Sequence, residues 1–111
     1  MKTTLTKYFR FSASYQDRHK ITGHNYILGV TTQALSRDEE LTLQAKVEEA
    51  LIKKLDSKDF GLDVDFLKGV EISDQRLLEI FWGILEKTLL PKPLEVLSLQ
   101  RNEATLVSLF A

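Results

Sequence analysis

The chain contains no cysteine, and this absence removes several kinds of chemistry at once. Without a thiol there can be no disulfide, no thiolate nucleophile and no cysteine-based zinc site. Histidine is also scarce, because His19 and His24 are the only two. Protein zinc sites use three or four ligands, so Tyr15, Asp17 or a more distant carboxylate would have to complete one. We therefore expect no metal site.

An excess of charge of either sign is lacking too, since 15 Lys and Arg stand against 16 Asp and Glu. Phosphate binding needs clustered cations, so we expect no nucleic-acid partner. No apolar run approaches the roughly 20 residues that span a bilayer. The segment Met1–Lys7 lacks the apolar core of a signal peptide. We expect no membrane partner and a cytoplasmic location.

What the chain does have is an ordinary globular composition over 111 residues, 43% of them hydrophobic. This length suits one domain with one core, which we place at residues 1–111. The sequence shows no glycine-rich phosphate loop, no G-x-S-x-G and no H-E-x-x-H. Common catalytic motifs therefore give no direct indication of function.

Alternation of apolar and polar residues predicts strands at both ends of the chain. Residues 4–14 alternate with period two, and residues 25–35 are rich in Tyr, Ile, Val and Thr. The polar stretch Gln16–Gly23 between them predicts a loop. Near the C-terminus, residues 94–101 and 105–110 predict two further strands joined by a tight turn at Asn102-Glu103.

Helical periodicity occupies the middle of the chain. Ser36 and Glu39 form a capping-box sequence, and the apolar spacing behind it predicts a helix over residues 37–56. Residues 56–72 are expected to be a long connection. Ser73 can cap a second helix, which we expect to end before Pro91-Lys92-Pro93.

The resulting order is ββααββ, an α+β arrangement. Its simplest packing is an antiparallel four-stranded sheet with two helices on one face. Such a sheet has one uncovered face and two open edges, and open edges are a liability unless they are paired. This geometry predicts self-association.

Four short stretches, in this order along the chain, resemble the motifs of one enzyme family. They are Phe11-Ser12-Ala13-Ser14-Tyr15, Gly23-His24-Asn25-Tyr26, Leu55-Asp56-Ser57-Lys58-Asp59-Phe60 and Ser73-Asp74-Gln75. The family is that of 6-pyruvoyl-tetrahydropterin synthase, which includes the bacterial 6-carboxy-tetrahydropterin synthases (QueD). Its patterns are F-S-A-S-H, C-x-x-x-H-G-H-N-Y, L-D-H-x-x-L-N and P-T-x-E-N. The resemblance implies the T-fold, in which subunits join their sheets into a ring-forming homo-oligomer, a trimer or a hexamer.

The departures from the family pattern affect its chemistry. The resemblance implies a zinc site of three histidines, whose positions here are Tyr15, Thr22 and His24. Only His24 remains as a remnant, so the resemblance implies no metal and no cofactor for this chain. The family's cysteine is absent, and its Asp-His pair is Asp56-Ser57. The Glu that anchors the pterin is replaced by Gln100 or Arg101, depending on strand register, and neither can match a donor edge as Glu does.

We therefore predict a catalytically inactive T-fold protein that could bind a pterin-like or purine-like heterocycle between subunits. The expected ligand-binding residues are Tyr15, His24, Asn25, Gln100 and Arg101, and the candidate catalytic residues are His24 and Asp56. The alternative is an active pterin lyase, or another T-fold enzyme, with a rearranged zinc-free site. Such a site would combine His24 with Tyr15, His19 or Asp56. A third possibility is an unrelated ββααββ domain, which strand order would reveal.

Overall fold

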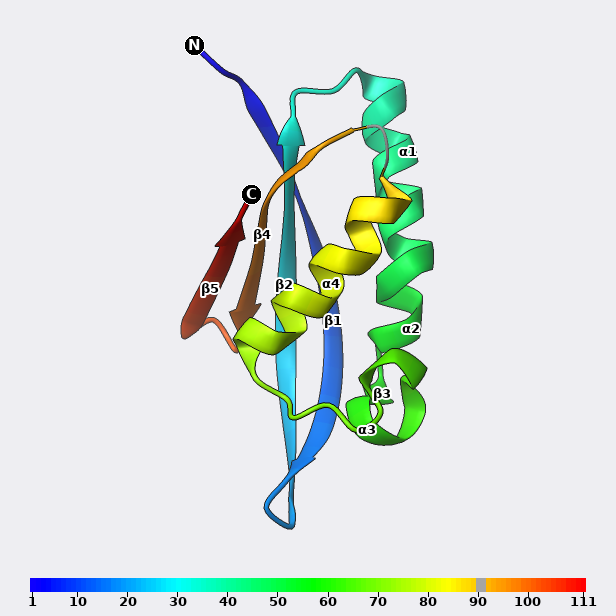
Figure 1. Cartoon of the computed structure of the whole chain (residues 1–111), viewed down its shortest axis with the longest axis vertical. Helices are drawn as coiled ribbons and strands as arrows, with labels where there is room; N and C mark the ends of the chain where they lie inside the picture. The colour runs from blue at the N-terminus through cyan, green and yellow to red at the C-terminus, as the bar shows by residue number, and fades with distance from the viewer. Residues whose placement is uncertain (90–91) are drawn as a thin grey trace.

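The chain folds into one sheet with helices on one of its faces (Figure 1). The computed structural model describes residues 1–89 and 92–111. Four long strands pair antiparallel in the order β1-β2-β4-β5. Their bounds are β1 (Thr4–Asp17), β2 (Lys20–Gln33), β4 (Leu94–Arg101) and β5 (Thr105–Phe110). The predicted α+β class and antiparallel core of the sheet are confirmed. The predicted number of strands is wrong, because the two-residue β3 (Lys58–Asp59) adds a fifth, parallel to β1.

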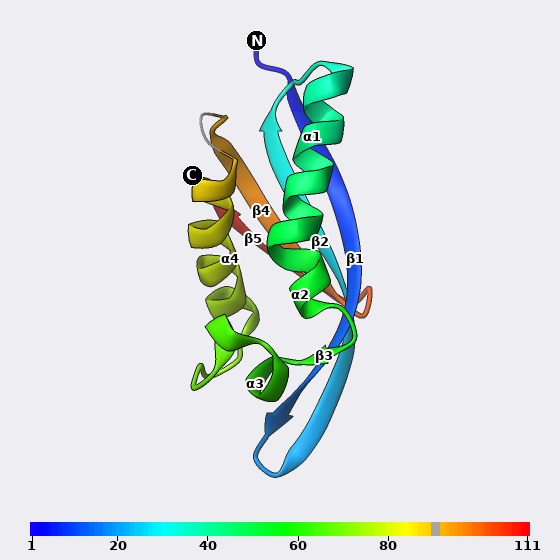
Figure 2. The same ribbon diagram turned by 90° about the vertical axis from the view of Figure 1, so that its right-hand side faces the viewer.

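Both long helical segments lie on the same side of the sheet, as predicted (Figure 2). The first runs without a break through α1 (Arg37–Val47), the π-helical turn η1 (Glu48–Ile52) and α2 (Lys53–Leu55). The second is α4 (Asp74–Thr88). The expected long connection contains, besides β3, a turn of helix α3 (Phe60–Asp63) and a 3-10 turn η2 (Asp65–Leu67). No helix in residues 1–89 and 92–111 is long and apolar enough to cross a membrane.

The helix starts agree with the capping signals in the sequence. The Ser36 hydroxyl accepts from the Glu39 N–H at 3.2 Å, and the Glu39 carboxylate accepts from the Ser36 N–H at 3.1 Å. The Ser73 hydroxyl accepts from the Arg76 N–H at 3.1 Å. Helix α4 ends at Thr88. The expected stop at Pro91 lies outside the described residues.

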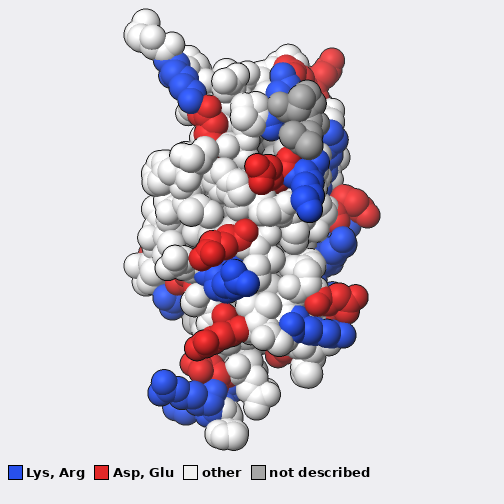
Figure 3. Space-filling model, in the orientation of Figure 1, with Lys and Arg blue, Asp and Glu red and all other residues white. Residues whose placement is uncertain are grey.

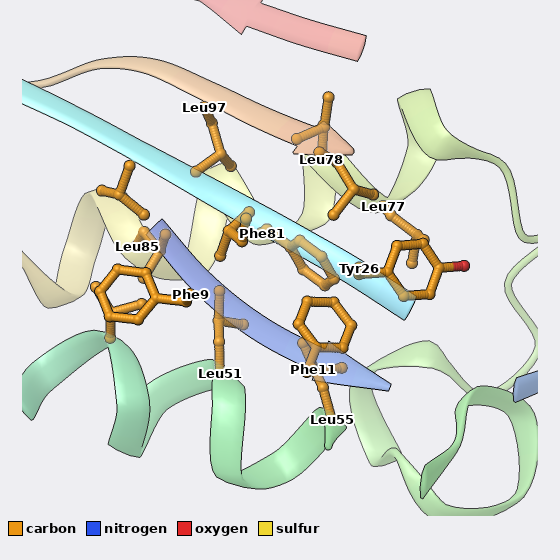
Figure 4. Packing of buried hydrophobic residues seen from close by; sticks show 14 of the residues in the cluster. Phe9, Phe11, Tyr26, Leu51, Leu55, Leu77, Leu78, Phe81, Leu85 and Leu97 are labelled. Carbon is orange, nitrogen blue, oxygen red and sulfur yellow. The ribbon is translucent and has the colours of Figure 1, made fainter. Parts of the chain in front are cut away.

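The core fills the layer between the sheet and the helices (Figure 4). The alternation in β1 sends Phe9 and Phe11 into this layer, where the Phe11 ring stacks on Tyr26 of β2 with ring centroids 5.0 Å apart. Leucines at helical spacing complete it from the other side, among them Leu51, Leu55, Leu77 and Leu85. This packing fixes which face of each strand carries the polar groups described below.

The hairpin of β1 and β2 is longer than the sequence predicts. The expected loop at Gln16–Gly23 is wrong, because both strands continue and only Arg18 and His19 form the turn, with φ of 47° and 72°. Pairing of β2 with β4 begins only at Tyr26, opposite Arg101. The hairpin therefore projects beyond the end of β4 as an arm, visible at the bottom of Figure 1.

Candidate functional site

The base of the hairpin arm brings together the three positions that the resemblance assigns to zinc. Tyr15 pairs directly with Thr22 across the two strands, and His24 is the next residue of β2 on the same face. This is the face that Phe9 and Phe11 turn toward the helices. The ring centroids of Tyr15 and His24 are 5.8 Å apart. The structure thus places the three residues side by side.

The residues at these positions do not fit a zinc ion. Zinc in proteins is held by thiolate, imidazole and carboxylate ligands, and this set offers one imidazole, one phenol and one alkyl hydroxyl. Among residues 1–89 and 92–111, no group of three His, Asp or Glu side chains lies close enough to hold a metal. Lewis-acid chemistry of the kind that the resemblance implies therefore has no ligand set here.

Aromatic rings surround His24 on the helix side. Tyr15 stacks on Phe60 of α3 with ring centroids 6.3 Å apart and an angle of 3° between the planes. His24 meets Tyr26 edge-on, at 5.7 Å and 81°. Burial raises the pKa of Tyr26 far above its ordinary value, so its phenol stays protonated at neutral pH. The rearranged site considered above would pair His24 with Tyr15, His19 or Asp56. Of these three, Tyr15 has its ring beside the His24 ring.

Asn102, which the sequence marks only as a turn residue, contacts His24 directly. Its side-chain Nδ2 lies 2.6 Å from His24 Nδ1, and its Oδ1 accepts from the Asn25 N–H at 2.9 Å. The pKa of His24 is lowered from its ordinary value, first by burial and then by the Arg101 guanidinium, while Asp74 acts in the opposite sense. The imidazole is therefore neutral at physiological pH.

A polar groove of about 540 Å³ lies beside His24. Its lining comes from the arm, from the segment around β3 and from the turn after β4. It includes Ser12, His24, Asn25, Asp59 and Asn102. The Ser12 hydroxyl donates to Asn25 Oδ1 at 2.7 Å, which leaves the Asn25 side-chain amide free to donate. Asn25 and His24 are neighbours in β2, so their side chains leave opposite faces of the strand.

Asp56 does not share this groove with His24. Its carboxylate accepts from the Ser12 N–H at 2.9 Å, while the Ser57 N–H donates to the Ser12 carbonyl at 2.6 Å. Asp56 instead lines an adjoining depression of about 370 Å³ that also contains Arg10 and shares Ser12 and Asn25 with the groove. The two candidate catalytic residues thus line different but adjoining depressions, and the contacts of Asp56 and Ser57 with Ser12 hold the end of α2 against β1.

Strand alternation separates the two candidates for the family's Glu position. Arg101 lies opposite Tyr26, on the helix-covered face, and its Nε donates to Asp74 Oδ2 at 3.2 Å. Gln100 lies opposite Ile27 and faces the uncovered side. Of the two, Arg101 is therefore the residue on the side of His24. Its guanidinium is a donor with no acceptor capacity.

Comparison with known proteins finds similarity in structure but not in sequence. No protein-family model matches the chain, and no curated protein matches it in sequence. Among solved structures, the Caenorhabditis elegans 6-pyruvoyl tetrahydropterin synthase superimposes with a TM-score of 0.80. The match covers 100% of this chain and 99% of that one, at 13% sequence identity. The chain therefore has the fold of 6-pyruvoyl tetrahydropterin synthase, and the T-fold expected from the motifs is confirmed.

Proposed function

We propose that this chain is a catalytically inactive, divergent relative of 6-pyruvoyl tetrahydropterin synthase. It assembles as a ring-forming homo-oligomer and uses the groove beside His24 to bind a small heterocycle. The observation that carries the proposal is the convergence of Tyr15, Thr22 and His24 on one face of the arm. These are the three positions that the resemblance assigns to zinc ligands, yet only His24 is an imidazole.

The remaining chemistry supports binding rather than turnover. General acid–base groups contribute typically 10²–10⁴-fold each to a rate, and a metal adds several kcal/mol of charge stabilisation. The chain has no cysteine, and Ser57 stands where the family pattern has an imidazole. The Asp56 carboxylate is engaged by a backbone N–H of β1. What is left near His24 is the rings of Tyr15 and Tyr26 and a groove lined by hydroxyl, amide and charged side chains, among them Lys58, Asp59 and Asp63, which can bind a polar planar ligand.

Two measurements on the purified protein test the inactive assignment. The first is elemental analysis after the metal-free protein is re-exposed to zinc, and we expect no stoichiometric zinc. The second is turnover of dihydroneopterin triphosphate with and without added zinc, and we expect none. About one tightly held zinc per chain, lost in His24→Ala, would contradict the proposal. So would measurable turnover that His24→Ala abolishes while the protein stays folded.

A further inference from the structure

Asn102 occupies an unusual backbone position in the turn between β4 and β5. Its φ is 51°, in the left-handed region that asparagine tolerates better than most side chains. In this conformation its N–H donates to the Asn25 carbonyl at 2.9 Å. Its side-chain Oδ1 accepts from the Asn25 N–H, also at 2.9 Å. Asn102 therefore extends the β4 ladder along β2 by one residue, using both its main chain and its side chain.

This pair of contacts determines which way the Asn102 amide points. The Asn25 N–H can only donate, so the atom that faces it must be the amide oxygen. The amide nitrogen then faces His24 Nδ1, 2.6 Å away. Because an amide nitrogen only donates, Nδ1 of His24 must be an unprotonated acceptor. The single proton of the neutral ring is then on Nε2.

The surroundings of the ring agree with this assignment. Partial burial and the Arg101 guanidinium both lower the pKa of His24, and Asp74 offsets only part of this. A second proton, on Nδ1, would also point at the Asn102 amide hydrogens. With Nδ1 occupied, the nitrogen left to meet a bound molecule is Nε2, and His24 lines the groove.

We infer that Asn102 is the positioning residue of the groove: it holds His24 as the neutral Nε2–H tautomer, so that His24 offers a ligand a hydrogen-bond donor. A heterocycle would then meet His24 through an acceptor atom, such as a ring carbonyl or a ring nitrogen without a proton. This second statement rests on the proposed function, whereas the tautomer of His24 does not.

The tautomer can be read directly because the chain has only two histidines. Long-range proton–nitrogen spectra of ¹⁵N-labelled protein, recorded at about pH 8, report which ring nitrogen of each histidine carries the proton. His19, in the exposed hairpin turn, serves as the internal reference for a ring without a fixed partner. We expect His24 to show one tautomer with unprotonated Nδ1, and His19 to show a mixture.

Two substitutions of Asn102 test whether its side chain fixes the tautomer of His24 or only stabilises the turn. Asn102→Asp keeps an acceptor for the Asn25 N–H but removes the donor, so the His24 proton should shift toward Nδ1, changing the tautomer ratio by roughly tenfold or more. Asn102→Gly keeps the positive φ and removes the amide, so His24 should approach the mixture of His19. The control is Glu103→Gly, at a φ of 64° in the same turn, which should leave His24 unchanged.

A mixture or an Nδ1–H ring at His24 in the unsubstituted protein would overturn the inference, even if the variants failed to fold. An unchanged His24 spectrum in both folded Asn102 variants would overturn it as well. Calorimetric titration with neopterin tests the ligand separately. Absence of binding there would count against the proposed function and leave the tautomer result standing. Neopterin binding that Asn102→Asp leaves unchanged would overturn the statement about the ligand's acceptor atom.

Discussion

Asp56 is the residue at which a structural role and a catalytic role make different predictions. Its carboxylate accepts from the Ser12 N–H of β1 and lines a depression that adjoins, but does not include, His24. A side-chain acceptor that satisfies a backbone donor contributes about 1 kcal/mol net, and less where water can replace it. Asp56 is exposed, so water can partly replace it.

We therefore expect Asp56→Ala to lower the free energy of unfolding by about 1 kcal/mol or less. Neopterin binding, where it is measurable, should not change. Urea denaturation of both proteins gives the first quantity, and calorimetric titration gives the second. Asp65→Ala is the matched control, because within residues 1–89 and 92–111 the Asp65 side chain makes only a surface ion pair with Lys68. Loss of a pterin turnover in folded Asp56→Ala would contradict the structural role.

Only some residues of the candidate site could be predicted from the sequence. The motif around Gly23-His24-Asn25 indicated His24 and Asn25. Residues 16–23 were expected to form a loop, so alternation did not predict that Tyr15, Thr22 and His24 share one face. Asn102 is separated from His24 by 78 positions and gives no signal except as a turn residue. Which of Gln100 and Arg101 faces His24 depends on the pairing of β4 with β2, and register is a tertiary property.

Among the elements, α1 has a strong local signal at its start. Its capping box is complete, and Glu39 also forms an ion pair with Lys92. The hydrogen bond from Lys92 and those from Ser36 lower the pKa of Glu39 to about 2, against an ordinary value of 4.5. A carboxylate with a lowered folded-state pKa stabilises the fold above its unfolded pKa and loses this contribution as pH falls through the folded value.

We expect Ser36→Ala to destabilise the protein by about 1 kcal/mol at neutral pH, the usual cost of losing an N-cap. The stability that depends on Glu39 should decline between about pH 4.5 and pH 2. Urea denaturation across this range should therefore show a smaller pH dependence for Glu39→Gln than for the unsubstituted chain. An equal pH dependence in the two proteins would argue against the ion pair and capping contacts in solution.

The elements that sequence patterns missed are those without a local signal. The turn at Arg18 and His19 has positive φ at both residues and no glycine, so polarity alone suggested a loop there. β3 has only two residues, below the length at which alternation can be detected. In contrast, helix α4 begins at the predicted cap residue Ser73, and the predicted helix is confirmed.

For the molecule as a whole, the open question is what covers the sheet face opposite the helices. Tyr8, Leu106 and Phe110 are 68%, 64% and 69% exposed, and the pairing register places all three on this face. Figure 3 views the opposite, helix-covered side, where charged side chains of both signs are spread without a large region of one sign. Among the described residues, β5 pairs only with β4, and Thr4–Phe11 of β1 pairs only with β2. Both edge strands thus have backbone N–H and C=O groups without a strand partner, and the uncovered face has exposed apolar side chains.

At micromolar concentration we expect the chain to form a ring-shaped oligomer, either a trimer or a hexamer. Pairing of β1 in one copy with β5 in the next would give both edge strands a partner and enclose the uncovered face. Light scattering gives the mass. Leu106→Glu should weaken assembly, since it places a charge on the face that becomes enclosed. Leu41→Glu is the matched control, because Leu41 on α1 is also exposed, at 51% against 64% for Leu106. A monomeric mass for the unsubstituted chain, or equal weakening by both substitutions, would contradict assembly through this face, and with it a ligand site completed between subunits.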